Sequence, residues 1–290
     1  MRWLSLMEKL RAPLMILPAV AIIILLFFGG LLVGLGQSLG YFPAIDSYDL
    51  TLRYYAEVLS DNIFFESLWQ TVRLALLSTV MSSVLAIALA LVLRQTFKGS
   101  RFFTFMFQLS IPIPHLVAAA GIVLLVSQSG ILARGAYALG LIDAPRDFPV
   151  MVFDRPGTAI QLTYLRKEVP FIGVVVLAVL QDSGPQYEEV ARTLGANSWQ
   201  RFRFVLLPLI MPGVLSTSII VFAYVFASYE IPLLLGVRQL TTLPVLACQN
   251  YQDPDLSLRP QAMAMSIILT LIAIVLLVAY KRLANYAVNR

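Results

Sequence analysis

The 290-residue chain contains 59% hydrophobic and 13% charged residues and has a mean hydropathy of +0.82. Because soluble domains usually carry about 25% charged residues, this composition excludes an ordinary water-soluble globule and indicates a membrane protein. One cysteine and one histidine exclude an internal disulfide framework, a Cys-rich metal site and a histidine cluster, and the net charge of +5 is too dispersed to indicate a nucleic-acid partner.

Apolar windows long enough to cross a bilayer recur along the whole chain. A hydrocarbon core of about 30 Å requires about 20 apolar residues in a helix. The first window is longer than a signal-peptide core and is followed by no small-residue cleavage site, so we expect a retained helix. The sequence therefore predicts an all-α membrane protein with a single transmembrane domain over residues 1–290 and six transmembrane helices. Their approximate positions are 14–36, 68–92, 103–127, 159–180, 204–227 and 262–280.

The fourth window is the least apolar of the six. Arg166, Lys167 and Glu168 lie in its first half, which we expect at the interface or against protein or water. These charges are candidates for the lining of a solute pathway, and Glu230, just after the fifth window, is a candidate for its outer gate. The alternatives are an interfacial ion-pair cluster and, for Glu230, a simple helix end.

Other residues inside the windows have more modest interpretations. Arg73 is expected to snorkel towards the outer interface, and His115 is interpreted as a packed or hydrogen-bonding residue. Neither His115 nor Cys248 is assigned a role. Prolines either shape helix packing only or bend helices around a water-lined path; these are Pro112, Pro114, Pro170, Pro208 and Pro212.

The basic residues predict the orientation of the chain. If the N-terminus lies inside, twelve of the 21 Lys and Arg residues and only four of the 16 acids fall in the inner segments. The positive-inside rule therefore places both termini in the cytoplasm, which agrees with an even number of spans. The segment from residue 181 to 203, between the fourth and fifth windows, is then cytoplasmic.

That segment has the pattern of a short helix, a sharp turn and a second short helix. Pro185 favours a helix start, and Glu188 and Glu189 lie in its favourable first turns. Gly195 can adopt the left-handed conformation that ends such a helix. A second amphipathic segment begins at Asn197 or Ser198 and leads into the next window.

This loop resembles the signature of the permease subunits of binding-protein-dependent ABC importers. The family pattern is Glu-Ala-Ala, three residues, Gly, nine residues and Ile-x-Leu-Pro. Two positions depart from it while remaining apolar, and all spacings are preserved. The matching residues here are Glu189-Val190-Ala191, Gly195 and Val205-Leu206-Leu207-Pro208.

The resemblance implies a type I importer permease in a bacterial inner membrane. In that family the loop is a coupling helix that docks on a cytoplasmic ATPase, which would supply the ATP and Mg²⁺ chemistry; this chain would bind no cofactor. The implied partners are two ATPase subunits, a second similar or identical permease, an extracytoplasmic solute-binding protein and membrane lipid. The implied coupling residues are Glu188, Glu189, Ala191, Gly195, Ala196, Leu207 and Pro208.

Other functional classes fit the sequence less well. The chain has no G-x-x-x-x-G-K-[ST] phosphate loop, so it is not expected to be an ATPase itself. No catalytic or metal-binding group is visible, which disfavours a membrane enzyme. A self-sufficient secondary transporter or channel is the alternative, and the loop could be an interfacial helix without a partner. The likeness is to the branch that imports polyamines, thiamine, ferric iron, phosphonates and related solutes.

Overall fold

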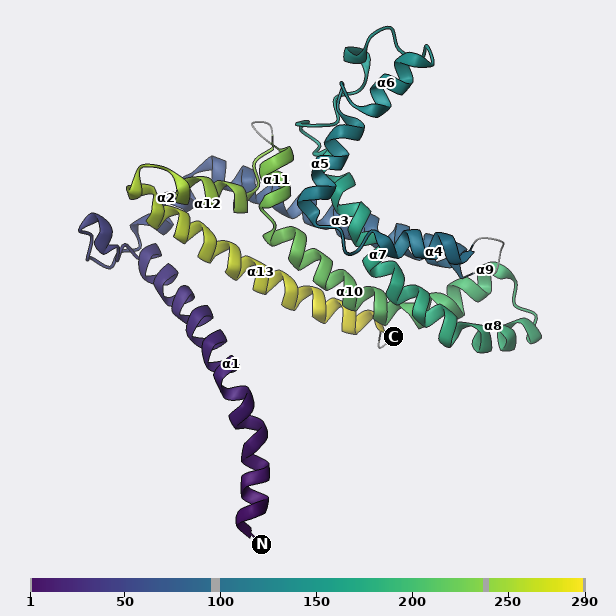
Figure 1. Cartoon of the computed structure of the whole chain (residues 1–290), viewed down its shortest axis with the longest axis horizontal. Coiled ribbons are helices and arrows are strands. Elements are labelled where there is room, and N and C mark those ends of the chain that lie inside the picture. Colours follow the sequence, from purple (N-terminus) through teal and green to yellow (C-terminus); the bar gives the residue numbers. More distant parts are fainter. Residues whose placement is uncertain (1, 95–99, 237–239, 289–290) are drawn as a thin grey trace. The chain divides into compact units, whose positions relative to one another are not determined.

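The computed structural model describes residues 2–94, 100–236 and 240–288, which are almost entirely helical (Figure 1). An isolated antiparallel bridge pairs Phe42 with Ser47. The helices are α1 (Arg2–Ser38), η1 (Pro43–Ile45), α2 (Arg53–Ser60), α3 (Asn62–Leu93), α4 (Ser100–Leu109), α5 (His115–Val126), α6 (Ile131–Ala138), η2 (Pro145–Asp147), α7 (Thr158–Asp182), α8 (Gly184–Thr193), α9 (Ser198–Arg201), η3 (Phe202–Leu206), α10 (Leu207–Ala227), α11 (Glu230–Leu235), α12 (Leu243–Gln252), η4 (Leu256–Leu258) and α13 (Arg259–Val288).

The chain divides into two compact units. The first consists of Met1–Asp61 and Ala247–Leu269, and the second of Asn62–Leu246 and Thr270–Arg290. In the first unit, the apolar stretch Met15–Ser38 of α1 is exposed over most of its length and becomes buried at Ser38. The second unit contains the packed helices that position the candidate sites. The single transmembrane domain over residues 1–290 stays a prediction.

The core of the second unit is the packing of α3 along α7, with α10 against both. The face that α3 buries is rich in small side chains, which allow helix backbones to approach closely within a membrane. Ser78 donates a hydrogen bond to Gln161 of α7 at 2.9 Å, and Thr71 accepts one from the backbone N–H of Leu243 at 2.8 Å. The small buried residues of α3 are Ser67, Thr71, Ala75, Ser78, Thr79, Ser82, Ala86 and Ala90.

Helix α7 continues through a buried proline. Pro170 has no N–H to donate to the carbonyl of Arg166, four residues earlier. The hydroxyl of Ser110 donates to that carbonyl at 2.8 Å, so a residue next to α4 supplies the hydrogen bond that the proline removes. On the same helix, Gly173 faces the ring of Phe107 so closely that a Cβ would lie 2.5 Å from it. These two contacts fix α4 against α7.

The segment predicted as a membrane span over residues 103–127 consists of two helices. Helix α4 ends at Leu109 and α5 begins at His115. The intervening Pro112 and Pro114 cannot donate backbone hydrogen bonds, and each drives the residue before it towards an extended conformation. Pro114 itself is extended, with ψ 145°, and serves as the N-cap of α5.

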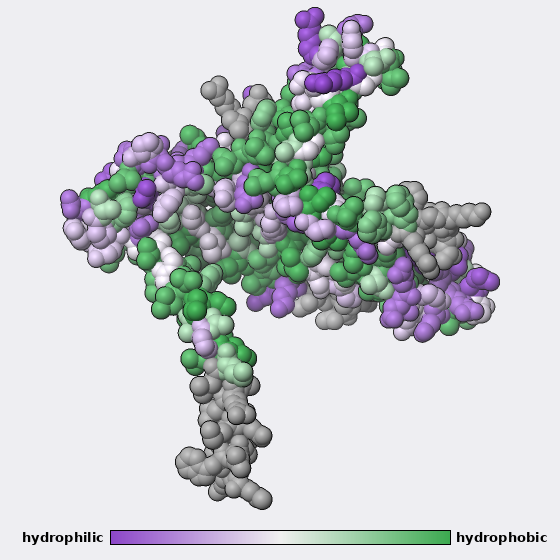
Figure 2. All heavy atoms as spheres, viewed as in Figure 1, coloured by the Kyte–Doolittle hydropathy of each residue, from purple (hydrophilic) through white to green (hydrophobic). Residues whose placement is uncertain are grey.

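Five helical stretches among the described residues are long and apolar enough to cross a membrane. Helix α7, the counterpart of the fourth predicted window, is 25 residues long but is not one of them, since it carries three consecutive charges. On the face that Figure 2 shows, hydrophobic side chains dominate the second unit, and hydrophilic ones gather over α8 and around α6. The count of six crossings stays a prediction. The five stretches are Met15–Ser38, Asn62–Leu93, His115–Ala138, Ser198–Ala227 and Leu256–Arg282.

Candidate functional site

The segment between α7 and α10 forms the helix, turn and second helix that its sequence predicts. Helix α8 ends in a Schellman turn: the N–H of Gly195 donates to the carbonyl of Arg192 and that of Ala196 to the carbonyl of Ala191, both at 3.0 Å. Gly195 has a φ of +81°, the left-handed conformation that glycine adopts at least cost. Nothing lies within 4 Å of where its Cβ would be, so its requirement is conformational rather than steric.

The second helix of the segment starts at a reciprocal cap. The side chain of Asn197 accepts a hydrogen bond from the N–H of Gln200 at 2.9 Å, and the side chain of Gln200 accepts one from the N–H of Asn197 at 2.8 Å. This arrangement satisfies two backbone donors that a helix start leaves unpaired. From Phe202 to Leu206 the helix widens into a π-helical turn before Pro208, which cannot donate to the carbonyl of Phe204.

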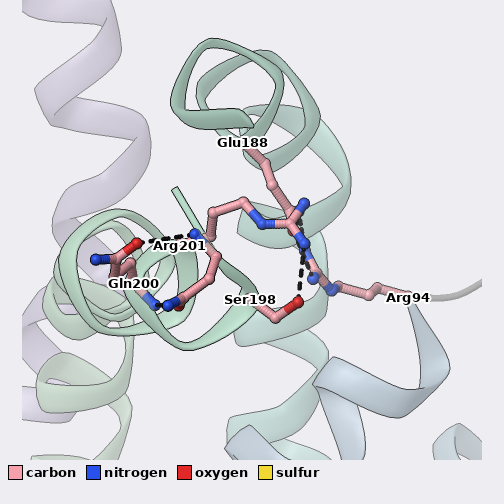
Figure 3. A network of polar contacts seen from close by, with 6 residues as sticks. Arg94, Glu188, Ser198, Gln200 and Arg201 are labelled. Carbon is pink, nitrogen blue, oxygen red and sulfur yellow. Dashed lines mark hydrogen bonds and ion pairs between the residues drawn. The ribbon is translucent and has the colours of Figure 1, made fainter. Parts of the chain in front are cut away.

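A carboxylate on α8 binds two arginines from different elements (Figure 3). Arg94, the residue after α3, donates from Nη1 and Nη2 to the two oxygens of Glu188 at 2.8 and 3.4 Å. Arg201 of α9 approaches Oε1 of Glu188 at 3.3 Å and donates to the hydroxyl of Ser198 at 3.1 Å. We call Arg94, Glu188 and Arg201 the arginine clamp. All three side chains are only about one-fifth exposed.

Two residues of the predicted contact surface face the chain itself. Ala191 is buried, so it is not available to a partner. The carboxylate of Glu188 is already bound by Arg94 and Arg201. Glu189 and Gly195 are exposed, Ala196 and Leu207 are half-buried, and Pro208 is exposed within the first turn of α10. The available carboxylate on α8 is therefore Glu189.

The sequence reasoning missed the apolar side chains that α8 leaves in the open. Tyr187, Val190 and Leu194 follow one another at three- and four-residue spacing, and the side chain of Leu194 is 82% exposed. Residues at this spacing lie on one face of a helix. The pattern of Val190 and Leu194 is visible in the sequence, but an apolar stripe usually indicates a buried face. Only the structure distinguishes a buried stripe from an exposed one.

A second group of polar residues lies where α5, α7 and α10 pack together. Lys167 Nζ lies 3.3 Å from His115 Nδ1, and His115 Nε2 lies 3.9 Å from Oε1 of the buried Glu168. An ammonium group only donates, so Nδ1 accepts and the proton of a neutral ring faces Glu168. The ring of His115 stacks on Tyr224 at 4.7 Å, and Tyr164 meets Tyr224 edge-on at 6.5 Å. These five residues form the His115 cluster.

The other two pathway candidates border the His115 cluster: Glu230 interacts electrostatically with Tyr164 and Tyr224, and Arg166 is the chain neighbour of Lys167. Glu230 is exposed at the first position of the six-residue α11. Arg166 is half-buried, and its Nε and Nη2 have no hydrogen-bond partner among the described residues. The sequence singled out His115 and the charged triplet separately. His115 and Lys167 are 52 residues apart in the sequence, and no sequence pattern predicts that they are in contact.

Arg73, which was expected to snorkel, is bound to the chain. Its Nη2 donates to the carbonyls of Arg155 and Pro156, both at 3.1 Å. This contact holds the loop that precedes α7 against α3. In the part of the chain that the structure describes, no three His, Cys, Asp or Glu side chains lie close enough together to hold a metal ion.

Comparisons with known proteins agree on one family. The model of the family described as "Binding-protein-dependent transport system inner membrane component" matches residues 82–290. The chain is 31% identical over 228 residues to the sulfate transport system permease protein CysW of Synechocystis sp., covering 77% of this chain and 78% of that protein. It is 28% identical to the molybdenum transport system permease protein ModB of Mycobacterium tuberculosis, covering 70% and 73%.

The fold has solved counterparts. A bacterial ABC transporter involved in the import of the acidic polysaccharide alginate aligns over 99% of both chains with a TM-score of 0.82 and 16% identity. An inward-facing methionine ABC transporter, MetNI, aligns over 80% of this chain with a TM-score of 0.57 and 17% identity. The chain therefore belongs to the binding-protein-dependent transport system inner membrane components, and it is a permease subunit of the type I ABC importers.

Proposed function

We propose that this permease is driven by a separate ATPase that docks on α8 and its following turn. The observation that carries the proposal is the exposed apolar row formed by Tyr187 and Val190 of α8 and by its C-cap residue, Leu194. Exposing large apolar side chains to water is energetically unfavourable, and an exposed apolar surface of this kind indicates a protein partner. A helix of this kind fits into a groove through its regularly spaced anchors.

Within the segment, six of the seven predicted coupling residues, all except Glu188, have a specific role in this proposal. Glu189 offers the partner an exposed carboxylate, while Gly195 and Ala196 form the turn that presents the docking face. Ala191 is buried and packs against the rest of the chain, which helps to hold α8 in place. Leu207 and Pro208 begin α10, so displacement of the segment is passed directly to that helix.

The solute pathway is proposed to run past the His115 cluster. Ionisable side chains within membrane-spanning segments are costly, and they usually face a cavity or a pathway. Lys167 and Glu168 are the charged members of the cluster. Arg166, with two unpartnered donor atoms, is proposed to border the same pathway, and Glu230 its outer end.

The complete importer is proposed to contain two ATPase subunits, a second permease similar or identical to this one, and an extracytoplasmic binding protein. ATP and Mg²⁺ bind the ATPase subunits, and this chain binds no cofactor. Relatives in this family include a putrescine transport system permease of Escherichia coli, PotI, and the sulfate permease, so the proposed cargo is a small polar solute. The chain is proposed to lie in the bacterial inner membrane with both termini in the cytoplasm, as the distribution of Lys and Arg favours.

Reconstitution tests this function. The permease is coexpressed with the ATPase and binding protein that copurify with it, purified as a complex and placed in proteoliposomes. ATP-dependent uptake that requires the binding protein, and that is lost with an ATPase variant unable to bind ATP, is the expected result. Uptake by the permease alone, driven by an ion gradient, would contradict the proposal and favour a secondary transporter.

A further inference from the structure

We propose that Glu188 is a positioning residue that makes α3 move together with α8 when the ATPase displaces α8. This inference rests on the proposed function. It adds a second connection through which movement of α8 reaches the other helices. The segment is already continuous with α7 and α10 through the backbone. The arginine clamp adds a link to α3, which is remote from α8 in the sequence.

The first argument is the number of elements that meet at one carboxylate. Glu188 lies on α8, Arg94 follows directly on α3, and Arg201 closes α9. The N–H of Arg94 donates to the carbonyl of Ala90 at 2.9 Å, so the backbone of Arg94 continues the helical hydrogen bonding of α3. The clamp therefore joins a docking helix to the last turn of a 32-residue helix.

The second argument is the quality of the contact. Arg94 uses both terminal nitrogens on both oxygens of Glu188, an arrangement that fixes orientation as well as distance. The side chains of Arg94 and Glu188 are 21% and 20% exposed, so water screens the pair less than it screens an open surface pair. A lone surface ion pair such as Arg53 with Glu57, 76% and 38% exposed, lacks this shielding.

The third argument is what removal of Glu188 leaves behind. Arg94 and Arg201 both point at its carboxylate (Figure 3), so a neutral side chain at this position leaves two cations facing the same space. Like charges repel, and we expect the end of α3 and the end of α9 to separate. The exposed row of α8 is not altered by this change. Docking and transmission of movement are therefore separable.

The helices that the clamp joins also carry the candidate pathway. Helix α3 packs along α7 and is bonded to it through Ser78 and Gln161. Helix α7 bears Lys167 and Glu168. If α8 moves with the clamp intact, α3 and α7 are displaced as one body. If the clamp is broken, α7 moves with α8 while α3 does not follow, so the packing between α3 and α7 changes.

The test is a double-mutant cycle in the reconstituted importer, with Glu188→Gln, Arg94→Gln and the two combined. In each single variant we expect normal copurification of the ATPase and normal basal ATP hydrolysis. Uptake per ATP hydrolysed is expected to fall about tenfold, which corresponds to about 1.4 kcal/mol and is usual for coupled residues in one ion-pair network. The combined variant is expected to be no worse than either single one.

Arg192→Gln is the matched control, because Arg192 is an exposed cation on the same helix. It is expected to retain wild-type uptake per ATP. Three results would overturn the inference: additive losses in the combined variant, an equal loss in the control, or reduced ATPase copurification by Glu188→Gln with Arg94→Gln unaffected. If wild-type protein takes up solute without any ATPase, the proposed function fails instead, so the two failures are distinguishable.

Discussion

Lys167 on α7 and His115 at the start of α5 are joined by a 3.3 Å contact between Nζ and Nδ1. The two residues flank distortions of the backbone: His115 follows Pro114, and Lys167 precedes Pro170. Each of these prolines lacks the N–H that would donate a helical hydrogen bond, close in sequence to His115 or Lys167. The contact therefore links two helices at points where each is interrupted or deprived of a backbone hydrogen bond.

Replacing Lys167 with methionine is expected to reduce solute uptake by about tenfold or more, an effect of about 1.4 kcal/mol. The substitution removes the only cation of the His115 cluster and leaves an unbranched side chain that is one atom shorter. Basal ATP hydrolysis and ATPase copurification are expected to stay at wild-type levels, because α8 is untouched. Uptake and hydrolysis measured on the same proteoliposomes check this prediction.

The matched control is Lys281→Met, which removes an exposed lysine from α13. We expect its uptake to equal that of the wild type. Full uptake by Lys167→Met would show that the His115 cluster does not serve transport.

Gly195→Arg is expected to leave the protein inserted but to uncouple ATP hydrolysis from transport. A residue other than glycine in the left-handed conformation costs about 1 to 2 kcal/mol, and the arginine side chain would also stand on the docking face. Gly195→Asn, which tolerates this conformation better, is the control and should retain most coupling. Membrane yield, ATP hydrolysis and uptake are the measurements, and normal uptake by Gly195→Arg would contradict the proposed docking site.

Glu189→Lys is expected to weaken the association of the ATPase, because it reverses the exposed carboxylate of α8. Copurification on a tagged permease over a range of salt concentrations measures the effect. Glu66→Lys makes the same charge reversal at an exposed position near the start of α3. It should leave the association of the ATPase unchanged. Undiminished association of the Glu189→Lys variant would remove Glu189 from the contact.

Asn197→Ala is expected to destabilise the second helix of the segment by about 1 kcal/mol, the usual effect of losing a helix N-cap. The loss leaves the N–H of Gln200 without its acceptor. Asn197→Ser restores a capping oxygen and should recover most of the stability. Thermal unfolding of the purified complex is the measurement, and identical midpoints for the alanine variant and the wild type would contradict this role for Asn197.

Much of the segment could be predicted from local sequence alone. Gly195 ends a helix because the left-handed conformation is cheap for glycine, and Asn197 starts one because its side chain reaches the N–H three residues on. Both signals are local and independent of the rest of the fold. Pro112 and Pro114 also signal the interruption between α4 and α5, although the apolar pattern continues through them.

The sequence by itself determined the membrane class, the family signature and the positions of most helices, because apolar length, proline, glycine and capping residues act over a few neighbouring positions. Tertiary structure alone decided which side chains meet. Arg94 with Glu188 and His115 with Lys167 are separated by 94 and 52 residues, and helix packing brings them together. It also decided that Ala191 faces inwards while Leu194 is exposed, since periodicity defines a helix face but not what covers it.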